Sequence, residues 1–133
     1  MRILNIILKV VFALILLMPV LGATGVFPPP TRDLYNTDEA FNFILMLMEG
    51  GYLPLMNAFV CLLAFISLAM KRTLLAAFLA LPITVNVIGF HAFLDGGLFT
   101  TGALLGNVMA LINLYLVYLH KDEVQQLFLQ DKG

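Results

Sequence analysis

The chain carries little charge and almost no cysteine, and both shortages exclude classes of function. Only 11% of its 133 residues are Asp, Glu, Lys or Arg, the net charge is -1, and no long basic run occurs. This composition argues against nucleic acid as a partner. The single cysteine, Cys61, excludes an internal disulfide, a Cys-x-x-Cys redox motif and any multi-cysteine metal or iron-sulfur site built by this chain alone.

Apolar residues are abundant, at 62% of the sequence, and indicate a membrane protein. A helix needs about 20 residues to cross the hydrocarbon core of a bilayer. Four apolar segments approach or reach that length, at about residues 3–21, 52–70, 73–93 and 98–119. We therefore predict an all-α integral membrane protein with a single domain over residues 1–133, folded as an antiparallel bundle of four transmembrane helices.

The positive charges predict how this bundle is oriented, because cytoplasmic loops carry an excess of Lys and Arg. If the chain crosses four times, one side receives Arg2, Lys9, Lys71, Arg72, Lys121 and Lys132. The other side keeps one positive residue, Arg32, with the acidic residues Asp33, Asp38, Glu39, Glu49 and Asp95. We expect both termini, including a tail over residues 120–133, to be cytoplasmic.

The first segment also has the order of a cleavable signal peptide, with a basic start, an apolar middle and small residues at its end. Its apolar run is longer than the usual core of a signal peptide. We therefore expect an uncleaved first helix.

The segment 22–51 is the longest stretch between the predicted spans. Pro28–Pro30 favour an extended chain, and residues 36–51 then have the pattern of a short helix. Asn36 or Thr37 is its expected N-cap and Gly50–Gly51 its stop. This helix is too short to span, so we place it at the extracytoplasmic face, in the interface or over the bundle.

Small and polar residues inside the spans predict where the helices meet. The expected helix-packing residues are Asn57, Asn86, Gly102, Gly106 and Asn113. Asparagine side chains in a membrane form hydrogen bonds across helices, and a Gly-x-x-x-Gly spacing lets two helices approach closely.

The stretch "VNVIGFHAFLDGG" contains His91, an ionisable residue within a span and therefore a candidate for a functional site. Asp95 follows at i+4, where it could pair with His91 if the helix continues that far. Glu49 could join them at the outer mouth of the bundle, forming a ligand site of three residues. The alternative is a neutral histidine with a structural role only.

The sequence offers no clear cofactor or metal site. A haem held by His91 and His120 is disfavoured, because the two lie near opposite faces, roughly 30 Å apart. Met46, Met48 and Met56 could be soft ligands for Cu(I), but their spacing and the lack of a nearby histidine favour packing. A quinone bound near His91 stays open as a possible cofactor.

The chain resembles the DoxX-like family of small bacterial membrane proteins over most of its length. The resemblance rests on "PITVNVIGFHAFL", on the entry "GGYLPLMN" to the second span, and on the ending "NLYLVYLHKDEVQQLF" with Tyr115 and Tyr118. It implies a four-helix bundle of the bacterial inner membrane with a helical insertion after the first helix. Members have been linked to quinone-related or sulfur-oxidising complexes and to oxidative-stress systems, but most have no assigned reaction.

Three functions follow as hypotheses. The first is a non-enzymatic accessory or structural subunit of a larger membrane assembly, because no set of acids, bases or ligands completes a reaction site. Its partners would be the lipid bilayer and other membrane proteins or further copies of the chain. The second is a redox-linked protein that binds a quinone or another apolar ligand near His91. A small channel or transporter is the third, disfavoured because no row of ionisable groups lines the spans.

Overall fold

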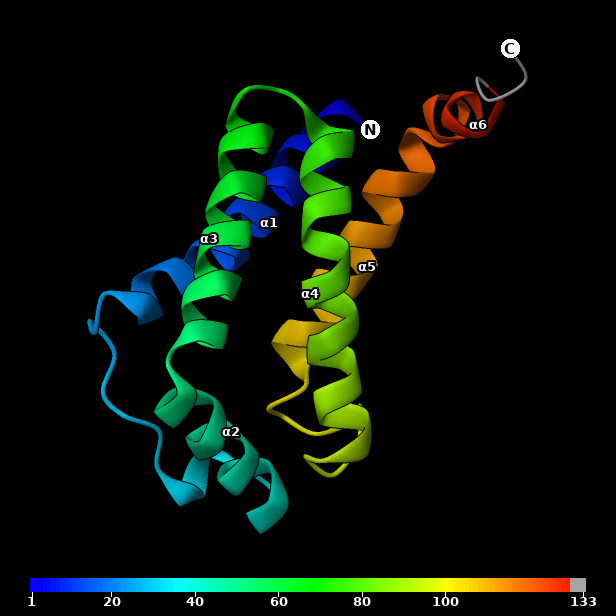
Figure 1. Cartoon of the computed structure of the whole chain (residues 1–133). Coiled ribbons are helices and arrows are strands. Elements are labelled where there is room, and N and C mark those ends of the chain that lie inside the picture. The colour runs from blue at the N-terminus through cyan, green and yellow to red at the C-terminus, as the bar shows by residue number, and fades with distance from the viewer. Residues whose placement is uncertain (130–133) are drawn as a thin grey trace.

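The structure, a computed structural model, describes residues 1–129, and every regular element within that range is a helix. The four long helices are α1 (Arg2–Ala23), α3 (Tyr52–Ala69), α4 (Thr73–Phe93) and α5 (Leu104–Leu119). α3 and α4 lie side by side, joined by a short turn, with α1 and α5 behind them (Figure 1). α1 and α4 do not form a main contact with each other, and each packs against both α3 and α5. The shorter elements are the 3-10 helix η1 (Arg32–Leu34), α2 (Asp38–Gly50) and α6 (Lys121–Leu129).

Several of these helices are candidate membrane spans. Within residues 1–129, α1, α3 and α4 are long and apolar enough to cross a membrane. α5 and α6 meet at an angle of 65°, and together they make a fourth candidate if they form one broken span. The described chain is therefore all-helical with three to four candidate spans, which is compatible with a multi-pass membrane protein. The end of the predicted tail, with Lys132, lies outside the described residues.

The last long helix starts later than the sequence predicted. α3 and α4 coincide with the predicted segments 52–70 and 73–93 to within one residue, but α5 begins at Leu104 instead of Leu98. Gly96 and Gly97 have φ angles of 82° and 105°, in the region that favours glycine, and they turn the chain after α4. Asn107 Nδ2 then donates to the carbonyl of Leu98 at 2.7 Å. This bond gives the Leu98 carbonyl a partner outside a helix. The apolar residues before α5 can therefore form turns instead of a helix.

α2 occupies the stretch that was expected to form a short helix. Thr37 is its N-cap, and the Thr37 side chain accepts a hydrogen bond from the backbone N–H of Ala40 at 3.1 Å. Gly51, with φ of 72°, both ends α2 and precedes α3. α2 therefore leads into α3 through one glycine, at the end of the fold opposite to the turn between α3 and α4 (Figure 1).

Small side chains form much of the contact between the long helices. The buried core includes Phe12 and Leu16 of α1, Cys61 and Ala64 of α3, Ala77 and Ala80 of α4, and Met109 and Leu116 of α5. In a membrane, where apolar side chains gain little by leaving lipid, small residues stabilise helix pairs by letting their backbones approach closely. The α3–α4 pair has this character on both sides.

α4 and α5 are joined by a hydrogen bond and by one close approach. Asn113 Nδ2 donates to Thr84 Oγ1 at 2.9 Å, and the Thr84 hydroxyl donates to the carbonyl of Ala80 at 2.9 Å. A Cβ atom added at Gly106 would lie 2.8 Å from Cγ1 of Val87. Among the expected helix-packing residues, Asn113 and Gly106 therefore lie at the contact between these two helices.

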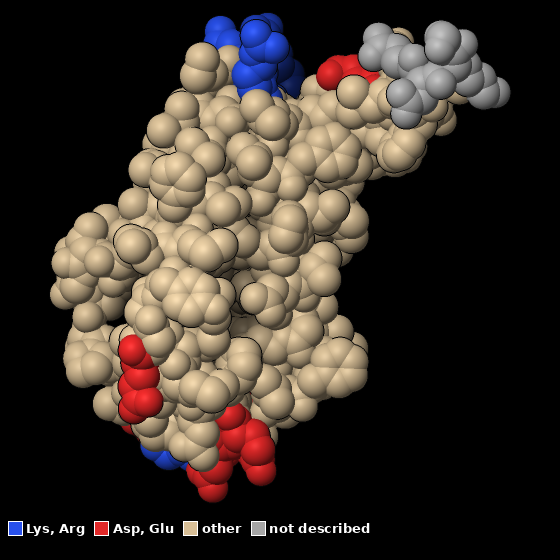
Figure 2. Space-filling model, in the orientation of Figure 1, with Lys and Arg blue, Asp and Glu red and all other residues tan. Residues whose placement is uncertain are grey.

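Charge is distributed unevenly along the fold, although a positive side chain also lies at the acidic end (Figure 2). Figure 2 shows Lys and Arg side chains at the end that carries the turn between α3 and α4, where Lys71 and Arg72 lie. Most acidic side chains on this face lie at the end that carries α2, apart from those near α6. The broad belt between the two ends shows no charged side chain in this view.

The contact at Gly106 gives a first prediction. Gly106→Ala should lower the melting temperature of the detergent-solubilised protein, because overpacking a tight contact costs about 1–3 kcal/mol. Val87→Ala in the same chain should restore most of the loss, because it removes the atom that the new methyl group meets. Thermal unfolding followed by circular dichroism measures both effects.

Gly89→Ala is the matched control, because a Cβ atom at Gly89 of α4 would meet nothing within 4 Å. It should leave the melting temperature unchanged or raise it, since alanine favours helix more than glycine. Equal behaviour of the Gly89 and Gly106 variants would contradict the close approach of α4 and α5.

Candidate functional site

His91 and Asp95 form a hydrogen-bonded pair at the end of α4. His91 lies in the last turn of the helix and Asp95 just beyond it, and His91 Nδ1 is 3.0 Å from Asp95 Oδ2. The Asp95 residue is only 1% exposed, and the His91 side chain is 13% exposed. The i, i+4 spacing predicted that the two could meet if the helix continued to Asp95. The helix ends at Phe93, and the two side chains still meet.

The chain before α2 holds the other side of Asp95. The backbone N–H of Asn36 donates to Asp95 Oδ1 at 2.8 Å, and Asn36 Nδ2 donates to the Asp95 carbonyl at 3.1 Å. The Thr37 hydroxyl donates to the carbonyl of Leu94. Because a buried carboxylate is costly unless its oxygens are paired, these bonds stabilise a fixed position of the α2 entry against the end of α4.

His91 keeps one ring nitrogen free. In a neutral imidazole one nitrogen donates and the other accepts, and a carboxylate on Nδ1 favours the proton at that position. Nε2 is then an acceptor, and within residues 1–129 it has no hydrogen-bond partner and is not fully buried. Cβ atoms added at Gly102 and Gly106 would lie 3.7 Å from Cε1 and 3.6 Å from Cδ2 of His91. The ring edge that carries Nε2 therefore faces the start of α5.

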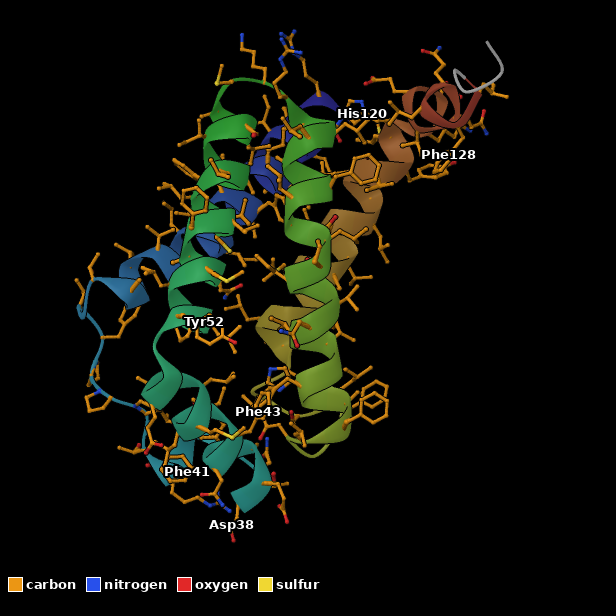
Figure 3. The ribbon with its side chains drawn as sticks, viewed as in Figure 1. Asp38, Phe41, Phe43, Tyr52, His120 and Phe128 are labelled. Atoms are coloured by element: carbon orange, nitrogen blue, oxygen red, sulfur yellow. The ribbon has the colours of Figure 1, made fainter. Side chains whose placement is uncertain are left out.

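A cluster of aromatic rings lies on one side of this pair. Phe90 packs edge-on against the His91 ring, with centroids 5.1 Å apart, and also contacts Tyr35 and Phe43. Phe43 projects from α2 toward α4 (Figure 3). Burial, and to a lesser extent the nearby charge of Asp95, raise the pKa of the Tyr35 phenol, so Tyr35 stays protonated and can donate a hydrogen bond at neutral pH.

Three pockets lie in this part of the fold, and His91 lines the first and the third of them. The first, about 400 Å³, lies between the α2 region and α4 and is lined by Tyr35, Phe43, Phe90, His91 and Asp95 among others. The second, about 540 Å³, lies between α2, α3 and α4, and the third, about 190 Å³, adjoins His91 from the side of α1 and α5. Asn57 lines all three, and Asn86 lines the first two. The first two volumes lie in the range typical of small-molecule sites.

The structure separates some of the residues that the sequence grouped. Glu49 is exposed and lines none of these pockets, so it does not join His91 and Asp95. The reason is helical geometry: Leu47 of α2 faces the pocket, and Glu49 two residues later points about 200° further round.

Not all of the predicted helix-packing residues lie where two helices meet. Asn57 and Asn86 make no side-chain hydrogen bond in the described part of the chain, and both line pockets. Gly102 precedes α5 and lies beside Asp95, where an added Cβ atom would be 3.4 Å from Oδ2. The Gly102-x-x-x-Gly106 spacing therefore does not form one continuous helical motif.

His120 lies at the opposite end of the fold, between α5 and α6, where it contacts Glu123 at 2.9 Å (Figure 3). His91 and His120 are thus not brought together. Within residues 1–129 no three His, Cys, Asp or Glu side chains lie close enough to hold a metal ion.

No family model, curated protein or solved structure matches this chain. The geometry around His91 and Asp95 is therefore the basis for assigning a function.

Sequence reasoning missed the part that the α2 entry plays. Asn36 and Thr37 were recognised only as candidates for the N-cap, although both also bind the end of α4. Asn36 and Asp95 are 59 residues apart, and no local pattern links them. The run of polar residues after Pro30 was the available signal, because polar groups next to an apolar core need partners.

The Asp95 contacts give a second prediction. Asp95→Ala removes the acceptor for the Asn36 N–H and should accelerate amide exchange at Asn36 and through the first turn of α2. The expected change is about 5- to 30-fold, since a hydrogen bond to a charged group contributes about 1–2 kcal/mol or more. Hydrogen exchange read by mass spectrometry over residues 34–50 measures it.

Asp95→Asn should have a smaller effect, because its amide oxygen can still accept from Asn36. Glu123→Ala is the control, since it removes an exposed histidine–carboxylate contact at the far end and should leave α2 unchanged. Unchanged exchange in Asp95→Ala would mean that α2 is held by other contacts.

Proposed function

We propose that this chain is a multi-pass membrane protein that binds a small, largely apolar molecule in the first pocket, with His91 contacting its polar group. One observation carries the proposal: the wall of an apolar pocket holds a histidine whose Nδ1 is fixed by a buried carboxylate and whose Nε2 is free. Binding sites for small molecules typically combine an apolar lining with a few placed polar groups.

A purely structural role for His91 explains less of this arrangement. The hydrogen bonds from Asn36 and Thr37 already fix the α2 entry at the end of α4. His91 pairs the second oxygen of Asp95, but this contact uses only Nδ1 and leaves Nε2 without a structural role. An ionisable group within a candidate span is also costly. A ligand that donates to Nε2 would give the imidazole a use.

The membrane arrangement is part of the proposal. We infer a four-helix antiparallel bundle in the bacterial inner membrane, with both termini on the cytoplasmic side. The separation of Lys71 and Arg72 from the acidic end that carries α2 supports it (Figure 2), because cytoplasmic ends carry the positive charges. Membership of the DoxX-like family stays a prediction from the sequence.

The role of accessory subunit also stays a prediction. The apolar residues exposed on α1, α3 and α5 are those that lipid covers in a membrane protein, so they do not favour a protein partner in particular. Ligand binding is compatible with a subunit of a larger assembly, and no reaction is proposed at the pocket.

The proposal predicts that a small molecule stays with the protein when it is extracted gently from its own membrane. Native mass spectrometry should detect a bound species, and His91→Ala should reduce its occupancy by about 3- to 10-fold, the value of one lost hydrogen bond.

His120→Ala is the matched control, because it removes a histidine at the opposite end of the fold. It should retain the wild-type occupancy. If no bound molecule appears, or if His91→Ala binds as the wild type does, His91 is not part of a binding site.

A further inference from the structure

The first and second pockets adjoin each other beneath α2. The two share five lining residues from three elements: Phe43, Ile44 and Leu47 of α2, Asn57 of α3, and Asn86 of α4. α2 therefore covers both pockets, and together they extend from His91 to the region beneath the helix.

The far part of this space is apolar and opens at the side of the fold. The second pocket adds Met48, Leu53, Pro54, Met56, Pro82 and Ile83 to the shared residues. Leu53 and Met56 at its rim are 40% and 57% exposed, on the surface of α3. Because α3 is a candidate span, this rim faces lipid in a membrane, and an apolar chain can enter from the bilayer.

The near part of the space has a mostly apolar lining with a few polar groups. Neither Lys nor Arg lines any of the three pockets within residues 1–129. The carboxylate oxygens of Asp95 are both occupied, by His91 and Asn36. An anionic head group would be buried here without a Lys or Arg partner, which is unfavourable. A cationic head group would also be unfavourable, because Asp95 is already paired.

The polar groups that remain suit a neutral head. Asn57 and Asn86 each carry two N–H donors and a carbonyl acceptor that are unused within the described chain, and His91 Nε2 accepts. A hydroxyl group can donate to Nε2 and accept from an amide, and a carbonyl group can accept from either amide.

Resting on the proposed function, we propose that the ligand is an uncharged single-chain amphiphile. Its hydroxyl or carbonyl head lies among His91, Asn57 and Asn86, and its chain lies in the second pocket beneath α2, reached from the bilayer. Molecules with a permanently charged head are excluded from the site.

Two photoactivatable probes test this ligand class in the full-length protein, reconstituted in phosphatidylcholine nanodiscs. One is a sixteen-carbon alcohol with a diazirine at mid-chain, and the other carries a sulfonate in place of the hydroxyl group. The alcohol should label peptides of the second pocket, such as residues 53–57, at least about tenfold more than the sulfonate, since tenfold corresponds to about 1.4 kcal/mol. Excess unlabelled alcohol should compete.

A pair of methionine variants tests where the chain lies. Met56→Trp narrows the second pocket and should reduce labelling by the alcohol several-fold. Met70→Trp is the matched control, because Met70 is similarly exposed at the other end of α3 and lines none of these pockets. Equal labelling of the two variants would overturn the chain position.

The remaining outcomes separate this inference from the proposed function. Equal or stronger labelling of the pocket by the sulfonate would overturn the neutral head while leaving the pocket as a binding site. Labelling by both probes only at lipid-facing positions outside the pockets, such as Leu111 of α5, would overturn the binding function as well.

Discussion

The buried carboxylate of Asp95 is the group on which the arrangement at this end of the fold depends. One of its oxygens accepts a hydrogen bond from the backbone N–H of Asn36, which lies just before α2. The other oxygen contacts His91 of α4. A carboxylate that is 1% exposed is tolerated only when both oxygens have partners. Its burial therefore requires the α2 entry and the end of α4 to be in place together, and these two segments form the walls of the first pocket.

The packing of α4 connects this site to the rest of the molecule. α4 contacts both α3 and α5, and its small residues Ala77 and Ala80 lie in the core. At Gly106 the backbone of α5 approaches Val87, and the same close approach sets α5 against the His91 ring. A larger residue at position 106 would push against both Val87 and the imidazole of His91. The same glycine therefore sets the contact between α4 and α5 and the position of α5 beside the His91 ring.

The sequence predicted the parts of the fold that depend on local pattern. α3 and α4 are long apolar runs bounded by Gly51 and by the Lys71–Arg72 pair, so their limits could be placed closely. The i, i+4 spacing suggested the His91–Asp95 contact, although α4 ends at Phe93, before it reaches Asp95. The start of α5 could not be predicted in this way, because residues 98–103 are apolar enough for a helix, while the Gly96–Gly97 turn and the Asn107 side chain provide an alternative.

Other features depend on which way a helix faces and on contacts distant in sequence. The residue type of Asn57 does not reveal whether its amide bonds to a neighbouring helix or lines a pocket, and here it lines pockets. Glu49 is close in sequence to the pocket-lining Leu47 but points elsewhere on α2. The Asn36–Asp95 contact spans 59 residues and arises only when the whole chain is folded.

The length of α5 has a consequence for membrane depth. Its 16 residues extend about 24 Å, against about 33 Å for the 22 residues of α1, and a typical hydrocarbon core is about 30 Å thick. If α1 spans the full core, the non-helical turns before α5 lie within hydrocarbon depth unless the bilayer thins there. Irregular backbone at that depth is stable only where protein or an internal cavity shields it from lipid. Hydrophobic mismatch at α5 would thus place the turns between α4 and α5, which lie beside His91, among the lipid acyl chains and below the head groups.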